Sequence, residues 1–358
     1  MKTKHSRMLT AGLAAVLATS GCDKGTDSFS LLSASAAFKQ STTYVQRKID
    51  ILWVIDTSGS MRTSQTNIAN NFSAFINRFQ SLGYDFHMGV TSTDAYLHYH
   101  FNNPNRSRLK DGVGTNRSGV YIMNRNTPNL QNVFMTNIML GTSGSGDERA
   151  FSSMEATLNN PLNAGFRRPG AFLAVIIVSD EDDYSHYDWG NGVASYYFTE
   201  DLNDPNMFSV THFKNYLDTL TNSSPSGPRN YSVSAITILD NACLAQLTDE
   251  FPERKIGRRY LELVEMTGGQ RGSLCGDFAS TLSLISDRVI ELSTTFRLDR
   301  EPYESTIVVT INGAVVPRSN TNGWSYDPAT WSITFHGQAI PQAGADVKIY
   351  FDPKSVKL

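Results

Sequence analysis

Apolar runs that suit buried strands alternate along the chain with stretches that suit amphipathic helices. The runs Ile49–Ile55 and Phe172–Val178 are almost continuously apolar, which is typical of strands buried on both faces of a sheet. Further strands are predicted at 86–90 and 231–239, and helices with apolar residues at three- and four-residue spacing at 68–79, 151–158, 210–220 and 282–292. This alternation predicts a doubly wound α/β fold, in which helices flank a mostly parallel sheet.

Residues 297–358 carry a different pattern. Asn312-Gly313 stands between two β-branched runs and is a strong signal for a two-residue hairpin turn. Segments 331–335 and 347–351 alternate apolar and polar residues with a period of two. We therefore expect a small β-sandwich-like domain over 297–358, packed on the α/β domain.

The N-terminus has the pattern of a processing signal. Three basic residues precede an apolar segment that is too short to span a bilayer as a helix, and the segment ends in T-S-G-C at Cys22. This ending resembles a lipobox, which implies a signal peptide over 1–22 and a lipidated Cys22; an ordinary secretory signal is the alternative. Residues 23–47 are rich in Ser, Thr and Ala and predict a flexible tether. We expect a bacterial lipoprotein on the periplasmic or extracellular face, at the outer membrane or cell surface rather than the inner membrane.

Composition and charge narrow the class of protein. Hydrophobic residues make up 40% and charged residues 18% of the 358 residues, as in globular proteins. The formal net charge of -3 gives no field that would favour nucleic acid. Of the three cysteines, Cys243 and Cys275 remain once Cys22 is acylated, and an oxidising compartment favours a disulfide between them over two buried thiols.

The motif that carries chemistry directly follows the first strand: Asp56-Thr57-Ser58-Gly59-Ser60. Taken singly, each serine could cap a helix and the aspartate could end a strand. Their joint spacing after a buried strand resembles the metal-ion-dependent adhesion site of von Willebrand factor type A (VWA) domains. Mg²⁺ prefers six oxygen ligands, and two hydroxyls two residues apart can offer theirs from one loop.

The resemblance to VWA domains covers roughly residues 48–296 and implies the other ligands of a Mg²⁺ (or Mn²⁺) ion. Asp180, which follows the strongest strand, matches the distal acid of the family. A hydroxyl from the segment before the next helix is also implied: residue type favours Thr142, which we prefer, whereas spacing favours Ser145. Asp182 and Asp183 belong to a solvated acidic loop or, alternatively, hold a second cation such as Ca²⁺.

Two aromatic-rich loops are expected around this site, because loops at the carboxyl ends of strands surround it. Such loops suit a binding surface, although their aromatic rings can equally pack the loops themselves. The ligand-contact candidates are Tyr96, His98, Tyr99, His100, Tyr184, His186 and Trp189. The pair His98 and His100 lacks a third ligand for a transition metal.

The motifs of several enzyme classes are missing from the sequence. Gly141–Gly146 is followed by Asp147-Glu148 rather than by the Lys and Ser or Thr of a phosphate-binding loop, and neither a Gly-x-Ser-x-Gly elbow nor a His-Glu-x-x-His motif occurs. We therefore predict a non-enzymatic protein for metal-dependent adhesion, whose partner is a protein or glycan that presents a carboxylate or other oxygen. A non-catalytic scaffold subunit of an envelope complex is the alternative, and a metal-free structural VWA fold comes third.

Overall fold

The computed structural model describes residues 40–43 as backbone, and residues 48–187, 199–224, 227–247, 251–342 and 344–355 in full. Contacts divide the chain into Met1–Phe38 and Lys39–Leu358, and the second unit is described below. The predicted signal peptide, the lipidated Cys22 and most of the predicted tether lie outside the described residues. Within the described residues, none of the helices has the length and apolar content needed to cross a membrane.

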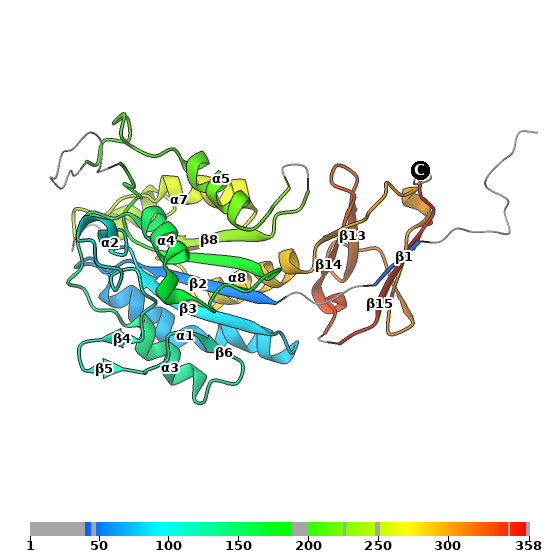
Figure 1. Cartoon of the computed structure of the whole chain (residues 1–358), viewed down its shortest axis with the longest axis horizontal. Helices are drawn as coiled ribbons and strands as arrows, with labels where there is room; N and C mark the ends of the chain where they lie inside the picture. Colours follow the sequence, from blue (N-terminus) through cyan, green and yellow to red (C-terminus); the bar gives the residue numbers. More distant parts are fainter. Residues whose placement is uncertain are drawn as a thin grey trace, which may run out of the picture. The chain divides into compact units, whose positions relative to one another are not determined.

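A six-stranded, mainly parallel sheet forms the centre of the larger part of the chain (Figure 1). Its strands, in spatial order, are β6 (Met123–Asn124), β3 (Phe86–Ser92), β2 (Ile49–Ile55), β7 (Phe172–Val178), β8 (Tyr231–Thr237) and β9 (Arg271–Ser273). Only β6 runs antiparallel, at one edge. In β2 and β7 all seven residues are buried, as their almost continuously apolar runs predict, and the one charged residue, Asp50 of β2, is buried with them.

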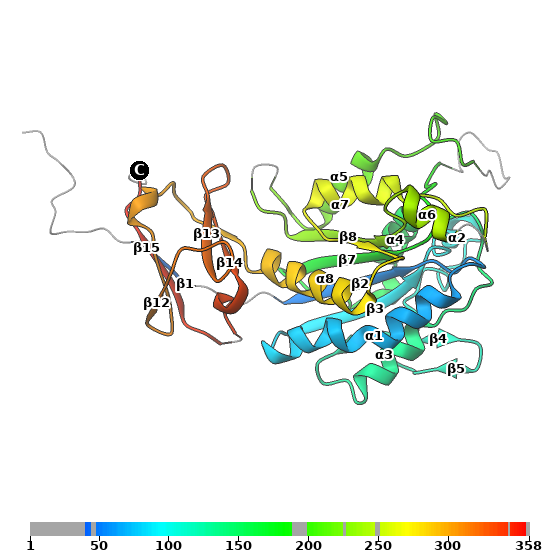
Figure 2. The ribbon, with the colours of Figure 1, turned by 180° about the vertical axis from the view of Figure 1, so that it is seen from behind.

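Helices cover both faces of this sheet, which confirms the predicted fold class (Figures 1 and 2). One face packs against α1 (Arg62–Ser81), α3 (Leu130–Ile138) and α8 (Phe278–Ser293), and the other against α4 (Ala150–Asn159), α5 (Val210–Leu220) and α7 (Arg258–Thr267). Successive residues of β2 point to opposite faces, so that Trp53 joins the first hydrophobic cluster and Val54 the second. Remaining elements are α2 (Leu97–His100), β4 (Gly112–Val113), β5 (Asn116–Arg117), α6 (Asn241–Leu247) and the 3₁₀ turn Pro161–Asn163.

The C-terminal part forms two small antiparallel sheets, as the sequence predicts. One has the order β1 (Gln40–Thr43), β15 (Val347–Phe351), β11 (Val308–Ile311) and β12 (Ala314–Val316); the other has β10 (Phe296–Arg297), β14 (Ser332–His336) and β13 (Gly323–Asp327), with 3₁₀ turns at Glu304–Thr306 and Gly337–Ala339. The hairpin turn is present, with φ angles of 51° at Asn312 and 82° at Gly313. This part packs on α8, where His336 Nδ1 lies 2.5 Å from Glu291 Oε1.

Strand β1 corrects part of the predicted tether. Gln40–Thr43 lies within the segment assigned to the tether, yet it pairs antiparallel with β15. The pairing is made by backbone groups at the edge of a sheet. A polar Q-S-T-T segment gives no hydrophobic signal for such pairing, which is why the sequence pattern missed it.

Candidate metal centre

Asp56 lies at the carboxyl end of β2 and is completely buried. Its Oδ1 accepts a hydrogen bond of 2.7 Å from the Ser58 backbone N–H, which curls the loop so that the hydroxyls of Ser58 and Ser60 lie 3.1 Å apart. Its Oδ2 accepts a hydrogen bond of 2.7 Å from the Ser179 hydroxyl. Because β2 and β7 are neighbouring parallel strands, the residues that follow them meet at one edge of the sheet.

Asp180 joins this group from the end of β7. The Ser60 hydroxyl donates a hydrogen bond of 2.9 Å to Asp180 Oδ1. The structure therefore brings together four of the predicted site residues, two carboxylates and two hydroxyls, from loops that are 120 residues apart in the chain.

The donor set fits a hard divalent cation. It consists of oxygens alone, which suits Mg²⁺ or Mn²⁺ better than softer metals. Burial, followed by the negative charge of Asp180, raises the pKa of Asp56 to about 7; a cation between the two carboxylates would offset both effects. No cluster of three or more His, Cys, Asp or Glu side chains in the described part of the chain is arranged to hold a metal, so a centre here depends on the serine hydroxyls.

Glu148 is a member of this region that sequence reasoning missed. Its side chain is fully buried, and within the described structure neither carboxylate oxygen accepts a hydrogen bond of good geometry, although the Thr93 hydroxyl is close enough to lower its pKa. Burial raises its pKa well above the usual value, and the charges of Asp56 and Glu181 raise it further. The available sequence signal was an acid two residues before an apolar helical stripe that begins at Ala150.

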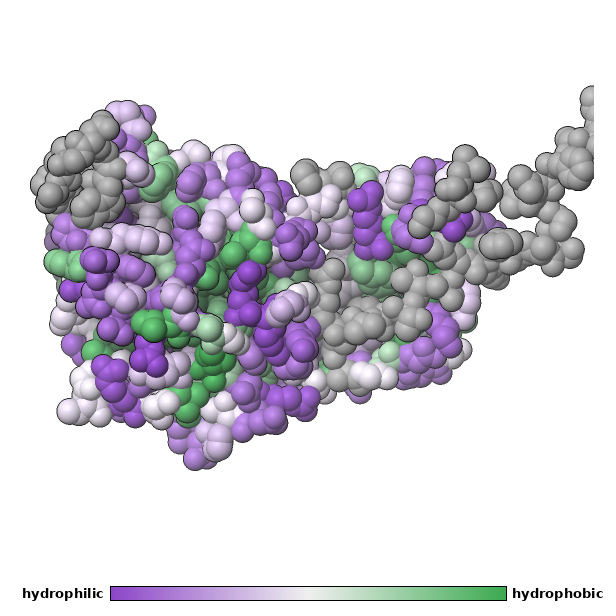
Figure 3. Space-filling model, viewed as in Figure 1, coloured by the Kyte–Doolittle hydropathy of each residue, from purple (hydrophilic) through white to green (hydrophobic). Residues whose placement is uncertain are grey.

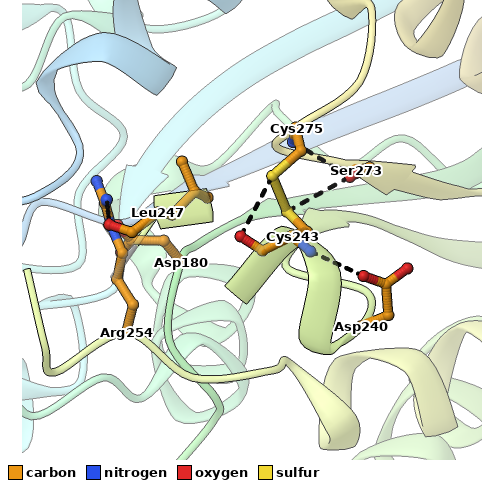
Figure 4. The surroundings of a disulfide bond; sticks show 7 residues. All are labelled: Asp180, Asp240, Cys243, Leu247, Arg254, Ser273 and Cys275. Atoms are coloured by element: carbon orange, nitrogen blue, oxygen red, sulfur yellow. Dashed lines mark hydrogen bonds and ion pairs between the residues drawn. A yellow bond between two sulfur atoms is a disulfide. The ribbon is translucent and has the colours of Figure 1, made fainter. Parts of the chain in front are cut away.

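Arg254 is the second residue that was missed. Its Nε donates a hydrogen bond of 2.7 Å to Asp180 Oδ2, and its Nη2 donates one of 3.2 Å to the Ser60 carbonyl. Its Nη1 donates to the carbonyl of Leu247, the last residue of α6 (Figure 4). The side chain is 7% exposed, so this cation is an internal part of the site. No local motif around Arg254 marks it, because the contact depends on how distant loops meet.

The predicted disulfide is confirmed. Cys243 of α6 is bonded to Cys275, which follows β9, with 5.7 Å between the Cα atoms (Figure 4). The bond fastens α6, whose last carbonyl receives the hydrogen bond from Arg254.

The loop that should supply a further hydroxyl crosses over the first motif. Gln65 of α1 donates from Nε2 to the carbonyls of Asp56 at 3.0 Å and Gly141 at 2.8 Å. The Gly144 N–H donates to the Thr57 carbonyl at 2.8 Å, and a Cβ atom on Gly144 would lie 2.2 Å from Thr57 Oγ1, so only glycine fits.

Neither hydroxyl proposed from that loop hydrogen-bonds to the four central side chains. Thr142 Oγ1 accepts a hydrogen bond of 3.4 Å from Arg62, and Ser145 Oγ accepts one of 3.1 Å from the Asp147 N–H. The loop therefore lies over Thr57, and both hydroxyls have their hydrogen-bond partners outside the four central side chains.

Asp182 and Asp183 are engaged in structural hydrogen bonds. Asp182 Oδ1 accepts from the N–H groups of Asp183 and Arg259, both at 2.9 Å. Asp183 Oδ2 accepts from the Phe151 N–H at 2.9 Å in the first turn of α4, and its Oδ1 pairs with the Arg259 guanidinium at 3.3 Å. Both carboxylates therefore have hydrogen-bond or ion-pair partners in the protein itself, without the second cation, Ca²⁺, that the sequence allowed.

The aromatic ligand-contact candidates need correction. Tyr96, Tyr184 and His186 are at most 4% exposed, so they pack the loops and do not form an open binding surface. The Tyr96 hydroxyl donates to Asp147 at 3.3 Å, and the Arg149 guanidinium lies 4.4 Å from the centroid of its ring. Of the remaining candidates, Tyr99 is 50% exposed, His98 and His100 are half-buried, and Trp189 lies outside the described residues.

Comparisons with known proteins give no family assignment. No protein-family model matches the sequence, and a search of curated proteins also finds no match. Solved structures that match include proximal thread matrix protein 1 from the mussel byssus, with 13% identity, a TM-score of 0.39 and coverage of 73% of this chain and 52% of that one. The pilus adhesin SpaC from Lactobacillus rhamnosus GG, in an open conformation, matches with 13% identity, a TM-score of 0.42 and coverage of 85% and 38%.

A further structure of the byssus protein, with a zinc-occupied MIDAS motif, has 12% identity, a TM-score of 0.35 and coverage of 73% and 52%. This chain thus spans about half of the byssus protein and less than half of the adhesin. At these TM-scores the matches carry no argument about function, and the α/β fold rests on the strand order and helix placement described above.

Proposed function

We propose that this protein binds a partner at the bacterial cell envelope through a divalent cation, Mg²⁺ (or Mn²⁺), held by Asp56, Ser58, Ser60 and Asp180. The observation that supports the proposal most is the convergence of these side chains, with the Ser60 hydroxyl 2.9 Å from Asp180 Oδ1 and 3.1 Å from the Ser58 hydroxyl. The proposed role is adhesion or ligand recognition without catalysis.

The local charges suit a cation that remains attractive to an anion. Ser58 and Ser60 contribute neutral oxygens, and the guanidinium of Arg254 already pairs with one oxygen of Asp180. The first turn of α1, which follows directly, has no acidic residue that would compete for its free N–H groups. When bound, the cation would supply an open coordination position for an oxygen of the partner, preferably a carboxylate.

The proposed setting follows from the sequence. The lipobox-like ending at Cys22 favours a lipid anchor as the means of membrane attachment, and the low net charge of -3 disfavours nucleic acid as a partner. The partner would be an envelope or extracellular protein or glycan.

One observation favours the alternative role of a metal-free scaffold. Arg254 bonds both Asp180 and the Ser60 carbonyl, so an internal cation already offsets part of the negative charge. In that role, the hydrogen bonds among Asp56, Ser58, Ser60 and Asp180 would serve to fix the loops.

Isothermal titration of Mg²⁺ and Mn²⁺ into the mature chain separates the two roles. We expect saturable binding to the parent chain and to Asp346→Ala, whose carboxylate lies on the exposed surface of the C-terminal part. We expect no binding to Ser60→Ala combined with Asp56→Ala. Equal heats from all three proteins, or none from the parent, would favour the scaffold.

A further inference from the structure

A cavity of about 630 Å³ adjoins the candidate metal centre. Its walls come from the segment 105–113, from Arg117 of the β4–β5 hairpin, and from the loop 140–144 that crosses the first motif. Thr57 and Gly144 line it as well, and their backbones are joined by the hydrogen bond of 2.8 Å described above. A ligand in this cavity would therefore lie beside the Ser58 and Ser60 loop.

Cations outnumber carboxylates among the lining residues. Arg117 is paired with Asp111 at 2.7 Å. Asp94, the other lining carboxylate, accepts hydrogen bonds from the Thr57 hydroxyl at 3.1 Å and from the Ser145 N–H at 3.0 Å. Within the described residues, neither Arg62 nor Arg108 forms an ion pair with a carboxylate. Arg62 is exposed, and its guanidinium donates a hydrogen bond of 3.4 Å to Thr142 Oγ1. The Arg108 guanidinium lies 3.9 Å from the ring centroid of Tyr121.

Lys110 adds a fourth cationic side chain at the cavity wall. Its Nζ donates to the Arg106 carbonyl at 2.7 Å. Burial lowers the pKa of Lys110 to about 8; the charges of Asp94 and Asp111 oppose this change, and those of Arg106 and Arg117 contribute to it. An anion in the cavity would stabilise the charged form of this lysine and use the free guanidinium groups.

The rest of the lining suits a hydroxyl-rich ligand better than a peptide. Short polar side chains, Ser92, Asn105 and Ser143, also line the cavity. Peptide interfaces usually depend on an aromatic or aliphatic anchor in a dry pocket. Here the Tyr121 ring lies beneath Arg108, and Leu109 and Leu140 belong to the hydrophobic core, which leaves Val113 as the exposed aliphatic residue of the lining. On the face seen in Figure 3, hydrophobic residues form small groups among hydrophilic ones rather than a broad apolar area.

We infer that this cavity binds an acidic glycan of the uronic-acid type, with one carboxylate directed to the metal centre and another to Arg62 and Arg108. This inference rests on the proposed function, because the first carboxylate needs the cation. Repeating carboxylates along a sugar chain would engage both places at once, which a single carboxylate cannot do.

The test measures binding of hexagalacturonate to the folded mature chain with saturating Mg²⁺, beside maltohexaose as the neutral sugar and hexaglutamate as the acidic peptide. We expect hexagalacturonate alone to bind well, and Arg62→Gln and Arg108→Gln each to weaken it about tenfold or more. Arg258→Gln, which removes an exposed arginine outside the cavity, should leave binding unchanged. Mg²⁺ titration of each variant should give the parental metal affinity.

The outcomes separate this inference from the proposed function. Metal binding without hexagalacturonate binding, or equal weakening by all three arginine variants, would overturn the inference alone. Stronger binding of hexaglutamate would assign the cavity to an acidic peptide and also overturn it. Hexagalacturonate binding that depends on Arg62 and Arg108 but persists in EDTA would overturn the placing of one carboxylate on the metal centre, and would contradict the metal-dependent function as well.

Discussion

Two buried aspartates, Asp56 and Asp50, lie close together in the chain, and removing their charges should change the free energy of unfolding in opposite directions. No cation of the described chain pairs with Asp56, and burial together with the charge of Asp180 raises its pKa from 3.8 to about 7. Asp50, on β2 itself, is equally buried but accepts hydrogen bonds of 2.6 Å from the Arg168 N–H and 2.8 Å from its Nε. Burial raises the pKa of Asp50 as well, but the hydrogen bonds and the charge of Arg168 oppose that rise. The comparison tests whether the ionised Asp56 destabilises the protein in the absence of metal, and whether a bound metal would remove that destabilisation.

The expected magnitude follows from the pKa. At pH 8 without metal, a rise of about three pKa units corresponds to about 4 kcal/mol of destabilisation by the ionised Asp56. Asp56→Asn removes that charge, while its amide oxygen still accepts from Ser58 N–H; we subtract about 1 kcal/mol for the weaker bond. The metal-free variant should therefore be more stable by about 2–3 kcal/mol. Asp50→Asn should instead be less stable by about 3–5 kcal/mol, because Arg168 loses its partner.

Urea unfolding of the three proteins in EDTA at pH 8 measures these differences, and the same series with Mg²⁺ measures the linked metal binding. Mg²⁺ should stabilise the parent and Asp50→Asn but not Asp56→Asn. If Asp56→Asn is less stable than the parent in EDTA, or gains stability from Mg²⁺ as the parent does, the reasoning about this carboxylate is wrong.

Three further perturbations test the surroundings of the site. Burial raises the pKa of Asp56 to about 7 and that of Glu181 to about 8, so the stability in EDTA should be greatest at acid pH and should fall as pH rises from about 5 to 8. The stabilisation by Mg²⁺ should be largest at pH 8. Thermal unfolding across this range measures both effects, and a gain of stability towards pH 8 in EDTA would contradict the expectation. Glu148→Gln should stabilise the protein in EDTA, as measured by unfolding, and should weaken Mg²⁺ binding, as measured by titration. An unchanged Mg²⁺ affinity would show that the charge of Glu148 does not act on the metal centre. Replacing Cys243 and Cys275 together by Ser removes a cross-link over a sequence separation of 32, and should lower the free energy of unfolding in urea by about 3–4 kcal/mol. As a control, reducing the disulfide of the parent should lower its free energy of unfolding by the same amount.

Sequence patterns predict the parts of this fold that depend on local burial. The bounds of β2 and β7 follow from almost continuously apolar runs, and the positions of Asp56 and Asp180 follow from the ends of those strands. The convergence of Asp56, Ser58, Ser60 and Asp180 could be predicted because neighbouring parallel strands end at the same edge. The resemblance to VWA domains supplied the expectation that Asp180 faces the serines.

Features that depend on the meeting of distant loops could not be predicted in this way. Arg254 reaches Asp180 from a loop 74 residues later, and no periodicity or motif marks that contact. Glu148 has the same residue type as many solvated acids, and only the packed structure reveals that it is buried. The aromatic loop residues Tyr96 and Tyr184 were expected at the surface, but their large apolar area favours burial when the loops are long enough to fold over them.

The central claim is that a divalent cation occupies the place where Asp56, Ser58, Ser60 and Asp180 converge. Crystals of the mature chain grown with Mn²⁺ locate the ion directly through its anomalous scattering. We expect one strong peak at bonding distance from the Ser58 and Ser60 hydroxyls, and no such peak in Asp56→Ala crystals. No peak in the parent, or a peak at Asp182 and Asp183 instead, would contradict it.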